Sequence, residues 1–266
     1  MTSYYILNMI KLLLILLLII FILVLSGAGC ERPRAFLGPP GSVSQTVQSM
    51  VSRKFVTSDG VTIAADYLKP VGAASAVLLL HMMPATKESW QPLTELLNKK
   101  GLATLAIDLR GHGESTVGVG GRELDYKKFS DVDQQTKKLD VSAGLEFLKR
   151  EGFALPDITL VGASIGANLA LQALAEHSEI KKAAALSPGL DYKGVVTKSL
   201  LEKIATDQQV FLIASEDDSY SADSARALAE TNPRAKLKIY DRAGHGTNMW
   251  FSQPALLPEL VEWLTQ

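Results

Sequence analysis

The sequence is poor in residues on which several classes of protein depend. It has one cysteine and four histidines in 266 residues, which excludes a disulfide framework, a CxxC redox pair and a cysteine-based zinc site, and it contains no HExxH motif. Its formal net charge of −1 argues against a nucleic-acid-binding protein, because binding of phosphates requires a basic surface. We therefore expect no metal, no cofactor and no nucleic-acid partner.

The length suits one globular domain of ordinary size and one additional segment. That segment lies at the N-terminus, where fourteen consecutive apolar residues run from Leu12 to Leu25 and Lys11 is the only charge before Glu31. Fourteen residues match the core of a signal peptide and fall below the about 18–20 that span a bilayer comfortably. The small residues after Leu25 lengthen the stretch, so a membrane anchor is also compatible with it.

Cys30 follows this run and a cluster of small residues, which resembles a bacterial lipoprotein signal, although Gly27 stands where that pattern has an aliphatic residue. Three alternatives stay open for residues 1–30: a lipoprotein signal acylated at Cys30, an uncleaved anchor, or a plain secretory signal. We expect the protein to be membrane-associated, with its domain on the extracytoplasmic side. Residues 31–50 mix Pro, Gly, Ser and Gln, which predicts a flexible tether to a domain over 51–266.

Across that domain, apolar runs typical of strands alternate with helical patterns. The predicted strands are 54–57, 62–68, 76–81, 103–108, 158–161, 183–186, 210–214 and 237–240. The predicted helices are 90–100, 132–150, 165–177, 222–230 and 254–265. Asp59-Gly60 between the first two strands indicates a hairpin. This order predicts an α/β fold with a mostly parallel eight-stranded sheet, helices on both faces and a ligand site at the carboxyl ends of the strands.

Hydrolytic side chains follow those strand ends. The strand at 158–161 leads into Gly162-Ala163-Ser164-Ile165-Gly166 and then a helical pattern, which is G-x-S-x-G in its required strand-turn-helix context. Ser215-Glu216-Asp217-Asp218 follows the strand at 210–214, and His245 follows the strand at 237–240. A serine needs an imidazole to take its proton, and the imidazole needs a carboxylate to fix its tautomer. The spacing therefore predicts Ser164 as nucleophile and His245 as base.

The order serine, acid, histidine, with AIDLRGHGES after the strand at 103–108 and AGHG around His245, resembles the α/β-hydrolase superfamily over about residues 53–266. The family pattern at the acid favours Asp218, with Asp217 the alternative. The resemblance also implies an oxyanion hole after the strand at 76–81. Because Pro84 has no N–H, its donors are expected to be Met83 and Ile165.

Only residues 187–209 connect the sixth and seventh predicted strands, too few for a lid domain. The resemblance therefore implies an open site, as in small esterases and the dienelactone-hydrolase-like or serine-aminopeptidase-like branches. The predicted function is a membrane-tethered serine hydrolase, a carboxylesterase acting on small esters or, less readily, amides. Two alternatives stay open: a catalytically silent binding protein of the same fold, and a cofactor-free perhydrolase or acyltransferase that uses the same three residues.

Overall fold

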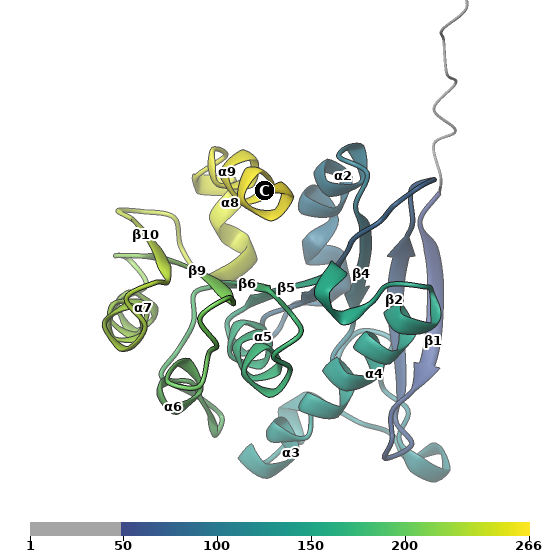
Figure 1. Cartoon of the computed structure of the whole chain (residues 1–266). Coiled ribbons are helices and arrows are strands. Elements are labelled where there is room, and N and C mark those ends of the chain that lie inside the picture. The colour runs from purple at the N-terminus through teal and green to yellow at the C-terminus, as the bar shows by residue number, and fades with distance from the viewer. Residues whose placement is uncertain (1–48) are drawn as a thin grey trace, which may run out of the picture. The chain divides into compact units, whose positions relative to one another are not determined.

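The computed structural model describes residues 49–266 (Figure 1). The predictions for residues 1–30, for acylation at Cys30 and for the tether up to residue 48 lie outside the described residues. Over residues 49–266, no helix combines the length and the apolarity needed to cross a membrane.

An eight-stranded sheet forms the centre of the described domain. Its strands are β1 (Val51–Val56), β2 (Thr62–Leu68), β3 (Ala76–Leu80), β4 (Ala103–Ile107), β5 (Ile158–Ala163), β6 (Lys182–Leu186), β9 (Gln209–Ser215) and β10 (Lys236–Tyr240). They lie in the order β1-β2-β4-β3-β5-β6-β9-β10, and only β2 runs antiparallel to its neighbours. The predicted α/β class with a mostly parallel eight-stranded sheet is confirmed.

Helices cover both faces of this sheet (Figure 1). One face carries α2 (Gln91–Lys99) and α9 (Leu256–Thr265), and the other carries α4 (Lys138–Arg150), α5 (Ile165–Glu176) and α7 (Ser219–Thr231). Strand β3 illustrates the consequence, because Leu78 and Leu80 enter the core on one side while Val77 and Leu79 enter the core on the other. Burial on both faces explains why the central strands are continuous apolar runs rather than alternating ones.

The structure divides the helix predicted over 132–150 into two, so the prediction of one continuous helix was wrong. Helix α3 (Asp131–Gln135) begins at the capping box of Ser130 and Asp133, and α4 starts at Lys138. Between them the Thr136 hydroxyl donates to the Asp133 carbonyl and accepts from the Arg110 guanidinium. These local bonds replace the regular helical ladder and let the next side chain, Lys137, turn into the interior.

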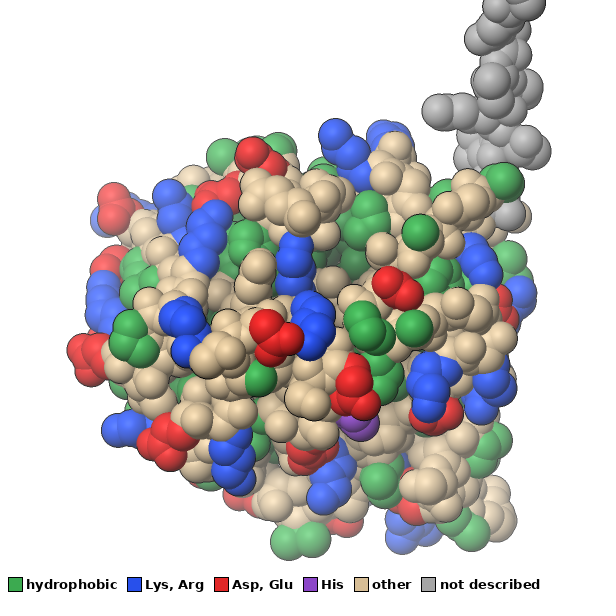
Figure 2. Space-filling model, viewed as in Figure 1, with side chains coloured by type: hydrophobic (Ala, Val, Ile, Leu, Met, Phe, Trp, Pro, Cys, Tyr) green, Lys and Arg blue, Asp and Glu red, His purple; other side chains and the backbone are tan. Residues whose placement is uncertain are grey.

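The connection between β6 and β9 contains a small hairpin, β7 (Asp191–Tyr192) and β8 (Val195–Val196), followed by α6 (Lys198–Leu201). The sequence predicts no lid domain here and does not reveal the hairpin, since two-residue strands carry no periodic signal. Helix α8 (Met249–Ser252), which was not predicted, precedes α9, and α9 corresponds to the helix predicted over 254–265. On the face shown in Figure 2, acidic and basic side chains are interspersed rather than gathered by sign.

Candidate active site

The strand order brings the sequence-predicted residues to one edge of the sheet. Ser164 follows β5, Asp218 follows β9 and His245 follows β10, while Met83 lies in the loop after β3, the strand beside β5. Because all four strands are parallel, their carboxyl ends share that edge.

Ser164 occupies a strained turn between β5 and α5. Its backbone has φ 55° and ψ −121°, a conformation that non-glycine residues rarely adopt. The turn requires the two flanking glycines: a Cβ on Gly162 would lie 2.0 Å from the Gly166 carbonyl oxygen, and a Cβ on Gly166 would lie 2.2 Å from the Leu80 carbonyl oxygen. G-x-S-x-G is therefore the only pattern that permits this approach of α5 to β3 and β5.

The N–H groups of Met83 and Ile165 are available as donors. Within the described residues, neither N–H donates a hydrogen bond to another protein group. Ile165 begins α5, so its N–H also lies at the positive end of the helix dipole. Two unpaired N–H groups on adjacent strand ends are the arrangement that stabilises negative charge developing on a substrate oxygen.

His81 braces the loop that carries Met83 and is itself fully buried. The Leu109 N–H donates to its Nε2 over 2.9 Å, so the ring proton is on Nδ1 and donates to the Met82 carbonyl over 2.8 Å. Burial lowers the pKa of His81 to about 4, which keeps the ring neutral in this role.

Asp218 is the acidic residue that contacts His245. Its Oδ2 lies 2.6 Å from His245 Nδ1. Burial alone would raise the pKa of Asp218, but hydrogen bonds from His245, Ser221 and Ser187 outweigh burial and lower it. The ionised carboxylate accepts the Nδ1 proton, which leaves the Nε2 lone pair of His245 free to accept another.

The two acidic residues before Asp218 have other partners. Asp217 Oδ1 accepts hydrogen bonds from the Ser215 hydroxyl and from the N–H of Gly244 at 3.1 Å, so it fixes the turn that leads to His245. Those hydrogen bonds lower the pKa of Asp217. Glu216 forms an exposed ion pair with Arg226.

Sequence reasoning missed Tyr192, which comes from β7 and packs against His245. Its hydroxyl lies 2.9 Å from Ser221 Oγ, and its ring meets the His245 ring edge-on at 6.4 Å between centroids. Within the described residues no hydrogen bond joins Ser164 to His245, although such bonds are often long before substrate binds. Ser164 is only 8% exposed.

Ser187 was also missed, although it stands directly after a predicted strand like the residues that were found. Its hydroxyl accepts from the Gly246 N–H over 2.9 Å and donates to the Met249 sulfur over 3.8 Å. Ser187 thereby ties the His245 loop to the end of β6.

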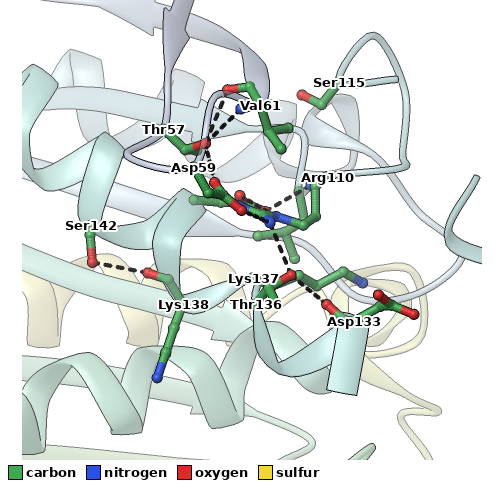
Figure 3. A network of polar contacts seen from close by, with 12 residues as sticks. Thr57, Asp59, Val61, Arg110, Ser115, Asp133, Thr136, Lys137, Lys138 and Ser142 are labelled. Atoms are coloured by element: carbon green, nitrogen blue, oxygen red, sulfur yellow. Dashed lines mark hydrogen bonds and ion pairs between the residues drawn. The ribbon is translucent and has the colours of Figure 1, made fainter. Parts of the chain in front are cut away.

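The DLRGHGES segment organises the surrounding loops. Arg110 pairs with Asp140 at 2.7 Å and with Asp59 at 2.7 Å, and it donates to Thr136 at 2.9 Å (Figure 3). Asp108 accepts from the backbone N–H of Lys87 and pairs with the Lys87 ammonium at 3.1 Å. Over residues 49–266, no group of three or more His, Cys, Asp or Glu side chains is placed to hold a metal ion.

Comparisons with known proteins bear on the fold that carries these residues. A family model described as the alpha/beta hydrolase fold matches residues 75–208, half of the chain. An esterase of Pyrococcus furiosus is 21% identical, with 82% of this chain and 92% of that chain covered and a TM-score of 0.66. A dienelactone hydrolase from Anabaena variabilis is 19% identical, with 82% and 95% covered and a TM-score of 0.63. An esterase from Exiguobacterium antarcticum is 15% identical, with 81% and 100% covered and a TM-score of 0.61.

At these identities the similarity to the solved structures is one of fold. The family match establishes the family, because it extends over half of the chain. It covers β3, β4, β5 and β6 together with the serine turn between β5 and α5. The chain belongs to the alpha/beta hydrolase fold family.

Proposed function

We propose that the protein is a serine hydrolase that cleaves carboxylic esters, with Ser164 as nucleophile, His245 as general base and Asp218 as the carboxylate that orients His245. The observation that carries the proposal is the contact of His245 Nδ1 with Asp218 Oδ2 at 2.6 Å, at the sheet edge where Ser164 stands on a strained turn. The esterases and the dienelactone hydrolase of similar fold support an ester substrate.

In the first half of the reaction, Ser164 Oγ attacks the ester carbonyl carbon while its proton passes to Nε2 of His245. For this the Ser164 hydroxyl has to approach His245, whose Nδ1 is held by Asp218 and whose Nε2 takes the proton. The N–H groups of Met83 and Ile165 bind the negative oxygen of the tetrahedral intermediate. His245 then gives the proton to the departing alcohol oxygen, and the acyl group stays on Ser164.

In the second half, water attacks the acyl carbon and its proton passes to His245 Nε2. The second tetrahedral intermediate uses the same two N–H donors. When it collapses, the bond to Ser164 Oγ breaks, His245 returns the proton to that oxygen, and the carboxylic acid leaves. Asp218 stays ionised throughout and stabilises the imidazolium in both halves.

The surroundings of Ser164 favour small esters over lipids and amides. The connection from β6 to β9 contains a short hairpin and one helical turn, so nothing the size of a lid domain covers the entrance. At the same time Tyr192 packs against His245, and the buried Met82 packs beside Gly246, where an added Cβ would lie 2.5 Å from its sulfur. These side chains leave little width for a bulky acyl group.

Labelling with a fluorophosphonate probe tests the proposal on the full-length protein in detergent, followed by hydrolysis of p-nitrophenyl esters of rising chain length. The wild type should label and should prefer short chains. Ser164→Ala should lose labelling and about 10⁴–10⁶ of turnover, whereas Ser142→Ala, at an exposed serine of α4, should change neither. Turnover should also fall toward acid pH, because only the neutral imidazole accepts the serine proton. Absence of labelling in the folded wild type would instead indicate a silent binding protein.

For the rest of the chain, we propose that residues 1–50 hold the domain at a membrane on the extracytoplasmic side. The proposal rests on the fourteen apolar residues from Leu12 to Leu25 and on the position of Cys30 after a cluster of small residues. Fractionation of cells that express the full-length protein is its direct test.

A further inference from the structure

Lys137 is a buried cation that lies outside the residues assigned above. It stands between α3 and α4, its side chain is 0% exposed, and Figure 3 shows it extending away from the contacts of Arg110. Its Nζ lies 3.2 Å from His112 Nε2 and 3.6 Å from Met83 Sδ. Among the described residues, no carboxylate oxygen lies within 4.0 Å of this ammonium.

The other buried cations are paired, which makes Lys137 exceptional. Arg110 has two carboxylates, and Lys87 has Asp108 at 3.1 Å and Glu114 at 3.0 Å. An ammonium buried without a counter-ion loses its hydration and regains little of it from an imidazole and a thioether. Methionine would fill the same volume without that cost. Packing therefore does not account for a lysine at this position.

His112 aims the ammonium at the Met83 loop. A lysine only donates hydrogen bonds, so the Nε2 of His112 is the acceptor and the ring is neutral. The ring is fixed on both sides, stacked on Tyr126 at 3.8 Å and edge-on to His81 at 4.8 Å between centroids. Burial holds the pKa of His112 well below its ordinary value, so it does not compete for the charge.

We propose that Lys137 is a positioning residue for ester cleavage, which places a positive charge behind the Met83 loop and so stabilises the negative oxygen held by the Met83 and Ile165 N–H groups. It acts through Met83, whose side chain it contacts, and not by touching the substrate. This inference rests on the proposed function, because Met83 serves as an oxyanion donor only if Ser164 is the nucleophile.

The charge of Lys137 changes in a pH range where its neighbours are constant. Burial lowers the pKa of Lys137 to about 8; attraction to Asp140 from α4 opposes this, and repulsion by Arg110 from the loop after β4 adds to it. His81 and His112 are already neutral above pH 7, Arg110 stays charged and Asp140 stays paired with it. Lys137 is therefore charged at pH 7 and neutral at pH 10.

The test is the second-order rate of fluorophosphonate labelling of the full-length protein between pH 6.5 and 10, which needs no knowledge of the natural substrate. In this step Ser164 Oγ bonds to phosphorus, fluoride leaves, His245 takes the serine proton, and the phosphoryl oxygen occupies the oxyanion hole. Loss of a direct oxyanion donor costs about 10²–10³, so an indirect charge should contribute about tenfold. We expect Lys137→Met to label about tenfold more slowly than wild type at pH 7. The ratio of the variant's labelling rate to that of the wild type should therefore be about one tenth at pH 7 and approach one at pH 10.

Matched controls separate this role from packing. Lys138→Met removes the neighbouring exposed lysine and should leave the ratio at one throughout. Tyr126→Phe removes only the hydroxyl and keeps the ring that stacks on His112, and in this background the ratio should still approach one above pH 8. Lys137→Met should unfold at the same or a higher temperature, because it removes a buried charge; Lys137→Gln is the second neutral variant if the first does not fold.

A rate ratio of one at pH 7, or a reduced ratio that does not change with pH, would overturn the inference, because a structural role alone has no reason to follow the charge of Lys137. Failure of the proposed function has a different signature. In that case the folded wild type would not label at any pH, and Ser164→Ala would not differ from it.

Discussion

Two adjacent aspartates after β9 have different partners, although only one position separates them in the sequence. Asp218 accepts from His245, whereas Asp217 accepts from the Ser215 hydroxyl and the N–H of Gly244. The residues are identical in type and neighbours in sequence, but Asp217 contacts the backbone of the loop after β10 and Asp218 contacts the His245 side chain of that same loop. Their chemistry is therefore set by geometry and not by composition.

Asp218→Asn should lower turnover by about 10⁴, because the amide cannot hold the imidazole in the tautomer that leaves Nε2 free. Asp217→Asn should cost far less, since its amide oxygen still accepts from the Gly244 N–H. Steady-state kinetics on a short-chain ester checks the ranking, with circular dichroism to verify the fold. The reverse ranking would make Asp217 the acid and contradict the contact with His245.

At the scale of elements, the break between α3 and α4 is held by Arg110. Its guanidinium joins the turn between β1 and β2 through Asp59, the end of α3 through Thr136 and the buried Asp140 of α4 (Figure 3). A single side chain from the loop after β4 thus fixes three elements. The same loop carries His112, which contacts the Lys137 ammonium, so the stability of the loop and the position of Lys137 are linked.

Arg110→Met should reduce the free energy of unfolding by about 3–5 kcal/mol, because it leaves the carboxylate of Asp140 buried without a counter-ion. Arg226→Met removes an arginine at the surface, whose ion pair with Glu216 is screened by solvent and should contribute far less. Urea denaturation at pH 7 compares the two variants. Equal, small losses would mean that Asp140 finds another partner or is protonated in the folded protein.

The hairpin of β7 and β8 determines how much room the nucleophile has. Tyr192 is wedged against Gly189, where an added Cβ would lie 2.7 Å from its ring. Tyr192→Ala should therefore open the site and shift the preferred p-nitrophenyl ester toward longer acyl chains. Tyr192→Phe keeps the ring and should keep the short-chain preference. Tyr220→Phe, which loses only the contact of the phenol with the Asp191 backbone, serves as the control. An unchanged chain-length profile in Tyr192→Ala would show that the tyrosine does not limit the acyl group.

The sequence predicts those features that are encoded by a periodic pattern or by neighbouring residues, and it does not predict those that depend on distant residues. The buried strands are apolar runs, and the serine turn carries its own pair of glycines, so the sheet and the location of Ser164 were predictable. The break at Thr136 was not, because apolar spacing continues across it and the bonds that cause it come from Arg110, 26 residues away. Tyr192 and Lys137 were missed for the same reason: their importance depends on partners distant in sequence, such as His245, His112 and Met83.

At the scale of the whole molecule, the chain separates the chemistry from the N-terminal segment. Every strand of the sheet and every proposed site residue lies between Val51 and the C-terminus, and the helices that cover the sheet come from the same range. The apolar run from Leu12 to Leu25 precedes all of them. The described domain thus has its own core, and we expect it to act without the N-terminal segment.

Deletion of residues 1–50 should therefore give a protein that stays in the aqueous fraction and still hydrolyses short esters, while the full-length protein sediments with membranes. Cys30→Ser distinguishes the alternatives for the N-terminal segment. If Cys30 is acylated after cleavage, the variant should lose incorporation of labelled palmitate and keep its uncleaved signal, visible as a larger mass. An uncleaved anchor would give the same mass and the same membrane fraction with and without Cys30. If residues 1–30 are a plain secretory signal, expression of the full-length protein should give a cleaved product that is free of membranes even with Cys30 intact. That result would overturn the proposed tether, because cleavage removes the apolar run from Leu12 to Leu25 that would hold the domain at the membrane.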